Sequence, residues 1–404
     1  MSIKSDFTIH NIPFGIFSIK NQPKCLATII GDQVVDLYAL AELGYFDDLK
    51  IKKTVFKKDY LNDFMVLGKV KTNAVRKRVQ EILSDFKKLP PSVFYHENSV
   101  QLHLPVQIGD YTDFYSSIEH ATNVGKMFRD PENALLPNWR HIPVGYHGRS
   151  SSIVVSGVPI HRPQGQVKPK DAPFPIFQPT ARLDFELETG FIIGKETALG
   201  ESIPIDQAEA YIFGKVLFND WSARDIQSWE YVPLGPFLGK NFASSMSPWV
   251  VTMEALAPFR VRGPQQEPQV LPYLQYSGDK NIDIQLEVSI LPEKGNETVV
   301  SRSNFKYMYW NMAQQLAHHT VNGCNVRIGD LMGSGTISGK DDTSLGSMLE
   351  LSWSGTKQLP LKGGIKRTFI EDNDTVIMRG YCEKEGVRVG FGTLSTKVLP
   401  VKQR

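Results

Sequence analysis

The chain has 404 residues and a formal net charge of +2, with 45 Lys and Arg side chains nearly balancing 43 Asp and Glu. These charges form no basic block or stripe, so we expect no nucleic-acid partner and no anionic membrane partner. No apolar run is long enough for a transmembrane helix, and the N-terminus lacks the apolar core of a secretory signal. The cysteines at 25, 324 and 382 are odd in number and far apart, which predicts reduced thiols and a cytoplasmic location.

The first part of the chain predicts a small β domain with one helix. Short apolar runs at residues 14–19, 25–30 and 34–37 are separated by turn residues, as in consecutive strands. Residues 72–86 predict an amphipathic helix, because apolar side chains recur there at helical spacing. The proline pair at 90 and 91 ends it. We expect a domain boundary after this helix, with domains at residues 1–105 and 106–404.

The larger part predicts a mainly β, α+β domain. Ser116 and Ser117 are suited to cap a helix that runs to Phe128 and carries His120 in its first turn. A second helix is expected over residues 307–321, ending at an Asn-Gly pair. Strands are expected at residues 183–193, 214–218, 249–253, 282–291, 348–353, 375–378 and 387–394.

The run Leu-Asp-Phe-Glu-Leu-Glu at residues 183–188 alternates strictly, which predicts that Asp184, Glu186 and Glu188 share one face of a strand. Three adjacent carboxylates repel one another unless water screens them or a cation neutralises them. Taken alone, the run favours a solvated face. Asp113 and Asp220, each set among aromatic residues, favour the alternative of a metal cage. The candidate set Asp113, Glu186, Glu188 and Asp220 offers only oxygen ligands, which favours Mg²⁺ or Ca²⁺ over zinc.

Possible oxyanion donors follow Asp220. Arg224 and Gln227 are three residues apart and would share a helix face, with Tyr231 and Lys240 shortly beyond. The commoner fate of such residues is a packed surface or a core, and His120 taken alone favours a structural histidine over a base. The glycine-rich run at 333–339 lacks the Gly-Lys-Ser/Thr ending of a phosphate loop, so we interpret it as a turn that approaches a ligand through its backbone or Thr336.

Several of these runs, taken together, closely resemble the fumarylacetoacetate hydrolase family over nearly the whole chain. They include residues 231–240 and 333–339 and the motifs Asp110-Tyr111-Thr112-Asp113-Phe114-Tyr115-Ser116-Ser117, His120-Ala121-Thr122-Asn123-Val124-Gly125, Pro137-Asn138-Trp139, Pro143-Val144-Gly145-Tyr146-His147-Gly148-Arg149 and Asn219-Asp220-Trp221-Ser222-Ala223-Arg224-Asp225-Ile226-Gln227. The resemblance implies a small N-terminal SH3-like barrel, a large mixed β-roll catalytic domain and a homodimer.

The resemblance also implies a role for each matching residue. A Ca²⁺ or Mg²⁺ ion would be held by Asp113, Glu186, Glu188 and Asp220. The general base would be His120, oriented by Glu350, and the oxyanion site would contain Arg224, Gln227 and Lys240. The substrate would be gripped by Arg129, Tyr146, Tyr231 and Thr336. A secondary cation would lie near Lys240 and Ser244, where family members carry threonine in place of the serine.

The implied reaction is hydrolysis of the carbon–carbon bond of 4-fumarylacetoacetate, a small dicarboxylate, to fumarate and acetoacetate in tyrosine and phenylalanine degradation. Such a cleavage needs a base for water, donors for an oxyanion and an electrophile for the enolate, which suits these residue types. Two other hypotheses stay open. One is an acylpyruvate hydrolase or oxaloacetate decarboxylase of the same superfamily, and the other is a non-catalytic, Ca²⁺-stabilised β module.

Overall fold

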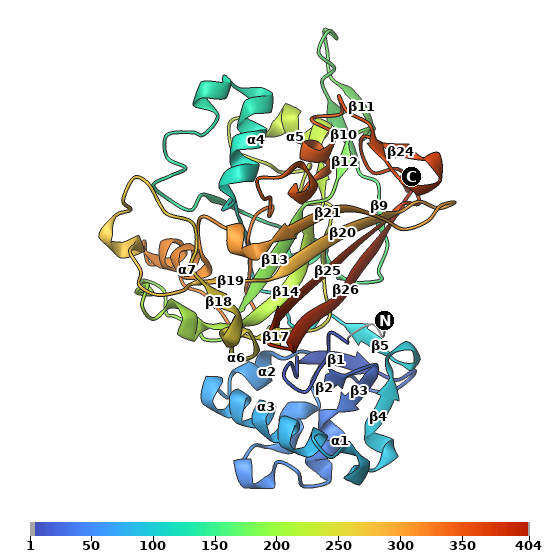
Figure 1. Ribbon diagram of the computed structural model, residues 1–404, viewed down its shortest axis with the longest axis vertical. Coiled ribbons are helices and arrows are strands. Elements are labelled where there is room, and N and C mark those ends of the chain that lie inside the picture. The colour runs from blue at the N-terminus through green and yellow to red at the C-terminus, as the bar shows by residue number, and fades with distance from the viewer. Residues whose placement is uncertain (1–4, 403–404) are drawn as a thin grey trace.

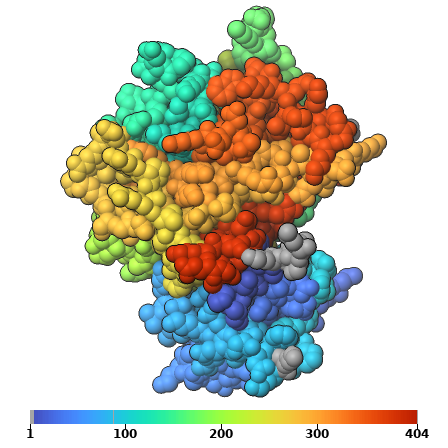
Figure 2. Space-filling view, viewed as in Figure 1, coloured from blue at the N-terminus to red at the C-terminus, as the bar shows by residue number. Residues whose placement is uncertain are grey.

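The computed structural model describes residues 5–402, so the first four residues of the expected 1–105 domain lie outside the described part. Within it, no helix combines the length and apolar character needed to cross a membrane. The molecule has a small lobe formed by the N-terminal part of the chain and a larger lobe above it (Figures 1 and 2).

The small lobe is built on a five-stranded antiparallel sheet in the order β4-β3-β2-β1-β5, which confirms the predicted small N-terminal β domain. Its strands are β1 (Gly15–Ser18), β2 (Cys25–Ile30), β3 (Gln33–Asp36), β4 (Phe94–His96) and β5 (Gln101–His103). Its helices are α1 (Leu37–Glu42), α2 (Asn62–Met65) and α3 (Lys69–Leu83). The expected helix over residues 72–86 is thus present, shifted by three residues towards the N-terminus.

The large lobe is built on two further sheets. The first has eight strands: β6 (Tyr111–Phe114), β7 (Gly145–His147), β8 (Ile153–Val155), β13 (Leu187–Ile193), β14 (Ile212–Asp220), β16 (Ser244–Met246), β17 (Val251–Thr252) and β22 (Leu331–Gly333). The second has five strands: β9 (Ile160–His161), β20 (Gln285–Leu291), β21 (Thr298–Asn304), β25 (Thr375–Lys384) and β26 (Val387–Leu399). In Figure 1, β25 and β26 lie across β13 and β14. Buried side chains between them, such as Leu217 and Met378, belong to one apolar core.

Smaller elements connect these sheets. Two-stranded pairs are β10 (Gln164–Val167) with β11 (Ile176–Pro179), β12 (Leu183–Asp184) with β15 (Ser222–Ala223), β18 (Arg260–Val261) with β19 (Asn281–Ile282), and β23 (Leu359–Pro360) with β24 (Lys366–Arg367). The helices are α4 (Ile118–Phe128), α5 (Arg224–Glu230), α6 (Met253–Leu256), α7 (Met312–Thr320) and α8 (Met348–Leu351). The expected cap of α4 is present, because the Ser117 hydroxyl accepts the His120 N–H at 3.2 Å.

Three element predictions need correction. The strand expected over residues 348–353 is wrong: Ser347 caps the short helix α8 there by accepting the N–H of Glu350. A short apolar run does not by itself distinguish a buried strand from a buried helix. The helix expected from residue 307 begins only at Met312, because Asn311 and Gln314 form a capping box. The strand expected over residues 183–193 is interrupted, with β12 and β13 pairing in different sheets.

The two lobes share an apolar core. Phe14 is fully buried, and its backbone exchanges two hydrogen bonds with Val250 of the large lobe. Its ring packs against Phe64 of the small lobe at 4.9 Å between centroids and against Phe213 of the large lobe at 6.2 Å. We therefore expect the proposed domains, residues 1–105 and 106–404, to unfold together.

Phe14→Ala is predicted to lower the free energy of unfolding by about 3–5 kcal/mol, because it removes a buried ring and leaves a cavity. Denaturant titration followed by circular dichroism measures this loss and should show one transition for both lobes. Phe86→Ala is the matched control, since this ring is 55% exposed and its loss should change stability by no more than ~0.5 kcal/mol. Equal stabilities for the two variants would contradict the shared core.

Candidate active site

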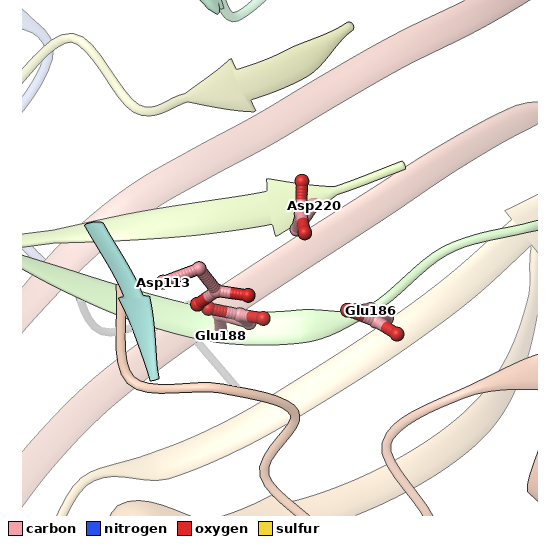
Figure 3. A group of neighbouring side chains, drawn as sticks. All are labelled: Asp113, Glu186, Glu188 and Asp220. Carbon is pink, nitrogen blue, oxygen red and sulfur yellow. The ribbon is translucent and has the colours of Figure 1, made fainter. Parts of the chain in front are cut away.

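Four carboxylates converge at one end of the eight-stranded sheet. Asp113 lies on β6, Glu188 on β13 and Asp220 at the end of β14, while Glu186 lies just before β13. The register brings them together, because β6 and β13 both pair with β22, and β14 pairs with β13. Figure 3 shows the four side chains pointing into one shared space. One ligand oxygen from each lies within 4.8 Å of all the others.

Gly333 on β22 leaves room for this cluster. It pairs with Asp113 on one side and with Gly190 of β13 on the other. A Cβ atom at position 333 would lie 2.6 Å from Asp113 Oδ1 and 3.0 Å from Glu188 Oε2. A residue with a side chain would therefore fill the space between two carboxylates, which explains the first glycine of the glycine-rich run.

The cluster is buried, so the expectation of a solvated face is wrong. Glu186 is 5% exposed, and Asp184 and Glu188 are fully buried. Asp184 does not join the cluster, because the strand is interrupted after it. Asp113 Oδ1 and Glu188 Oε1 have no hydrogen-bond partner. Buried carboxylate oxygens without partners are costly unless a cation neutralises them.

The electrostatics divide the cluster into two sides. Burial, followed by the charge of Asp220, raises the pKa of Asp113 well above its ordinary value. Burial, followed by the charge of Asp113, does the same for Glu188. For Glu186, burial also raises the pKa, but positive charges led by Lys240 outweigh it and bring the pKa to about 2. Among the described residues, Lys240 and Arg224 form ion pairs with Glu186 and Asp220 and none with Asp113 or Glu188.

This donor set fits a hard divalent cation. All candidate ligands are oxygens, and their mutual spacing of up to 4.8 Å fits within a coordination sphere of roughly 2.3–2.6 Å radius, as for Ca²⁺. The nearby positive charge comes from Lys240 and from Arg224, whose guanidinium also pairs with Asp184. At least two of the four negative charges therefore lack a partner, which matches the charge of Mg²⁺ or Ca²⁺.

Lys240 forms ion pairs with Glu186 and Asp220, the other two carboxylates of the cluster. Its Nζ lies 2.5 Å from Glu186 Oε2 and 2.7 Å from Asp220 Oδ2. Burial lowers the pKa of Lys240, but the charges of Asp220 and Glu186 more than offset this and raise it, so the amine is protonated. Asp220 also accepts hydrogen bonds from the hydroxyls of Tyr146 at 2.6 Å and Ser244 at 3.0 Å. The hydroxyl proton of Ser244 is therefore already donated to Asp220.

His120 and Glu350 form a buried pair beside the cluster. The Nδ1 atom of His120 lies 2.7 Å from Glu350 Oε2. Burial raises the pKa of Glu350, but the charge of His120 and hydrogen bonds from His120, Asn123 and Ser338 lower it to a net value below the ordinary one. Ser347 also donates to this carboxylate, at 2.9 Å. An ionised carboxylate only accepts hydrogen bonds, so it holds the proton on Nδ1 and leaves Nε2 as the basic nitrogen.

Arg224 and Gln227 share one face of α5, as their spacing predicts. Arg224 is bound on two sides: its Nε donates to Asp184 at 2.7 Å, and its Nη2 forms an ion pair with Glu186 at 2.7 Å. Its Nη1 reaches the Gln227 side-chain oxygen at 3.4 Å. The Gln227 amide nitrogen is left available to donate.

One cavity of about 290 Å³ brings most of the predicted residues together. The predicted residues in its lining are Asp113, His120, Tyr146, Glu186, Arg224, Gln227, Lys240 and Thr336. Prediction missed Tyr115, which also lines the cavity and packs edge-on against the ring of His120 at 5.2 Å between centroids. Its place two residues after Asp113, in a run already singled out, is the signal that could have identified it.

Arg129 and Tyr231 lie outside the cavity lining. Arg129 ends α4 and donates through Nε and Nη2 to the carbonyl of Ala134. Tyr231 follows α5 and is 55% exposed. Their role in binding the substrate stays a prediction, and each side chain would have to turn towards the cavity to fulfil it.

A larger cavity of about 920 Å³ lies on the other side of α4, lined by residues such as Glu119, Asn123 and Lys126. Its charged side chains are mostly exposed, and it contains neither the carboxylate cluster nor His120. Convergence of buried, perturbed titratable groups identifies the smaller cavity as the candidate active site.

Comparisons with known proteins cover both lobes. A family model described as fumarylacetoacetate (FAA) hydrolase C-terminal matches residues 111–399, and one described as fumarylacetoacetase N-terminal matches residues 10–105. The chain is 53% identical to fumarylacetoacetase of Rattus norvegicus, over 98% of this chain and 97% of that protein. It is 54% identical to fumarylacetoacetase of Dictyostelium discoideum, over 100% and 98%, and 48% identical to that of Arabidopsis thaliana, over 98% and 96%.

A solved structure, fumarylacetoacetate hydrolase from psychrophilic Exiguobacterium antarcticum, is similar in fold. It superimposes with a TM-score of 0.56 at 17% identity, over 96% of this chain and 99% of that one. The chain therefore belongs to the fumarylacetoacetate hydrolase family.

Proposed function

We propose that this chain hydrolyses the carbon–carbon bond of 4-fumarylacetoacetate to give fumarate and acetoacetate, the last step of tyrosine and phenylalanine degradation. The observation that carries this proposal is that one cavity of about 290 Å³ is lined by His120, by the oxyanion donors and by two of the four clustered carboxylates, Asp113 and Glu186. The carboxylate of Glu350 lies behind His120, 2.7 Å from its Nδ1. Relatives near 50% identity over their full length are fumarylacetoacetases. This likeness favours the proposal over the superfamily rivals, acylpyruvate hydrolase and oxaloacetate decarboxylase.

In the proposed mechanism, His120 acts as the general base. Its Nε2 takes a proton from water, and the resulting hydroxide attacks the substrate carbonyl. Glu350 stabilises the imidazolium that forms, because its charge lies 2.7 Å from Nδ1. After the carbon–carbon bond breaks, the imidazolium returns the proton to the departing carbon, which completes acetoacetate and regenerates the base.

Arg224, Gln227 and Lys240 stabilise the oxyanion that the attack creates. Two N–H groups of Lys240 bind Glu186 and Asp220, so the third is available, and the Gln227 amide has two donors. Donors fixed in this way need little reorganisation when charge develops. Tyr146, Thr336, Arg129 and Tyr231 are proposed to hold the carboxylates and the chain of the substrate.

Asp113, Glu186, Glu188 and Asp220 are proposed to hold Mg²⁺ or Ca²⁺, with a secondary cation near Lys240 and Ser244. The principal ion would supply Lewis-acid stabilisation of the enolate leaving group. The main support is the pair of buried, unpartnered oxygens on Asp113 and Glu188.

A homodimer in the cytoplasm is part of the proposal. Support comes from large apolar side chains exposed close together after α5, including Val232 at 66%, Leu234 at 98% and Phe237 at 65%. Such patches mark association surfaces. The described cysteines are free thiols, in keeping with a reducing compartment. Sedimentation velocity should give twice the chain mass of 45.4 kDa, and a monomer at micromolar concentration would contradict the dimer.

Chelation is predicted to abolish turnover reversibly. Loss of the enol ultraviolet absorbance of 4-fumarylacetoacetate should stop after EDTA treatment and return when Mg²⁺ or Ca²⁺ is added, because the enolate then regains its electrophile. Appearance of fumarate and acetoacetate identifies the reaction. Faster turnover of acylpyruvates or oxaloacetate would favour the superfamily rivals, and no turnover of any of these substrates would favour the non-catalytic module.

His120→Ala is predicted to lower kcat by ~10²- to 10⁴-fold, the usual contribution of a positioned base. Cation affinity, measured by calorimetry, should stay unchanged because His120 is not one of the four clustered carboxylates. The matched control is His161→Ala, an exposed histidine that does not line the cavity, which should keep full activity. A His120→Ala enzyme as active as the control would rule out this base.

Gly333→Ala is predicted to weaken cation affinity by at least ~10-fold, comparable to the loss of a supporting contact at a metal site. The added methyl group would crowd Asp113 and Glu188. Gly190→Ala is the control, because it alters the paired position in the sheet, and the three atoms nearest to a Cβ there belong to the side chains of Leu331 and Val216. Calorimetric titration of both variants provides the comparison, and equal affinities would show that the cation binds elsewhere.

A further inference from the structure

Asp184 connects two parts of the site that are far apart in sequence. Its side chain is fully buried. One oxygen, Oδ1, accepts the Met348 N–H at 2.6 Å, and the other, Oδ2, accepts the Leu349 N–H at 3.0 Å and the Arg224 Nε–H at 2.7 Å. One carboxylate thus binds both the first turn of α8 and the guanidinium of α5.

The contact with α8 bears on the general base. Met348, Leu349 and Glu350 are the first three residues of this helix, and Ser347 accepts the N–H of Glu350 at 3.3 Å. Asp184 and Ser347 together satisfy all three leading N–H groups, and the negative charge of Asp184 suits a helix N-terminus. The place of Asp184 therefore fixes the backbone from which Glu350 reaches His120.

The contact with Arg224 bears on the oxyanion donors. Arg224 has a second carboxylate neighbour, Glu186, which is also one of the clustered acids. With Asp184 holding Nε, the guanidinium keeps a fixed orientation in which Nη1 faces Gln227. Without it, the guanidinium would keep one carboxylate neighbour, Glu186, and the longer contact with Gln227.

We propose that Asp184 is a positioning residue that sets the spacing between the general base and the oxyanion donors. It touches neither the cavity nor the clustered oxygens, so it would act through Glu350 and Arg224. This inference rests on the proposed hydrolytic function and assigns that site a supporting residue on β12.

Asp184→Asn tests the proposal, because it keeps the shape of the side chain while removing its charge and one acceptor oxygen. We expect kcat and kcat/KM to fall together by ~10- to 100-fold, as when reacting groups are slightly misplaced. KM should stay nearly unchanged, because the interaction acts in the transition state.

Asp374→Asn is the matched control. Asp374 is also fully buried and binds an arginine, accepting Arg367 Nε at 2.8 Å and Nη2 at 2.9 Å, together with the Glu371 N–H at 2.9 Å. None of these three residues lines the cavity. Both variants should lose thermal stability, but only Asp184→Asn should lose kcat when each is assayed well below its melting temperature. Equal kcat values in the two variants would overturn the proposal.

A double-mutant cycle with Glu350→Gln separates positioning from a general loss of structure. If Asp184 acts through Glu350, Asp184→Asn should lower kcat much less in the Glu350→Gln background than in the wild type, because the effects of coupled residues are not additive. The same fold-loss in both backgrounds would assign Asp184 a purely structural role.

A readout without turnover keeps the inference separate from the proposed function. The proton that His120 Nδ1 donates to Glu350 should give a low-field NMR signal, assigned by its absence in His120→Ala. Asp184→Asn should shift or broaden this signal, whereas Asp374→Asn should not. An unchanged signal would overturn the positioning role even if the substrate were another one. If the wild type does not turn over 4-fumarylacetoacetate but Asp184→Asn still shifts the signal, only the proposed hydrolytic function is rejected.

Discussion

Negative charge crowded into a buried space is the constraint on which the rest of this structure depends. Four carboxylates from β6, β13, β14 and the segment before β13 place one oxygen each within 4.8 Å of the others. Burial and mutual repulsion raise the pKa of Asp113 and Glu188. The fold compensates on one side with Lys240 and Arg224 and leaves the other side suited to a divalent cation.

The proposed catalytic groups are arranged around this charge by contacts from separate elements. His120 is held by Glu350 on α8, and the proposed oxyanion donors lie on α5 and in the segment that follows. The interruption between β12 and β13 matters here, because it directs Asp184 to Arg224 and α8 while Glu186 and Glu188 face the cluster. One stretch of six residues thereby supports both the cluster and the groups beside it.

The sequence predicts those parts of this arrangement that depend on residues close together in the chain, such as helix caps and helix faces. Ser117 caps α4 as its residue type indicates, and Arg224 and Gln227 share a helix face as their spacing requires. The burial of Glu186 and Glu188 was not predictable from the strand itself, because it depends on pairing with β14 and on Gly333 in β22. Likewise, α8 depends on the Ser347 cap and on Asp184, which is more than 150 residues away in the chain.

The central claim is that the four carboxylates share one divalent cation. Anomalous diffraction from crystals soaked in Mn²⁺, an ion with similar oxygen ligands, tests it most directly. The account predicts one strong anomalous peak within ~2.0–2.6 Å of oxygens from Asp113, Glu186, Glu188 and Asp220. No peak beside these four side chains would contradict it, whether or not a second peak appears near Lys240 and Ser244.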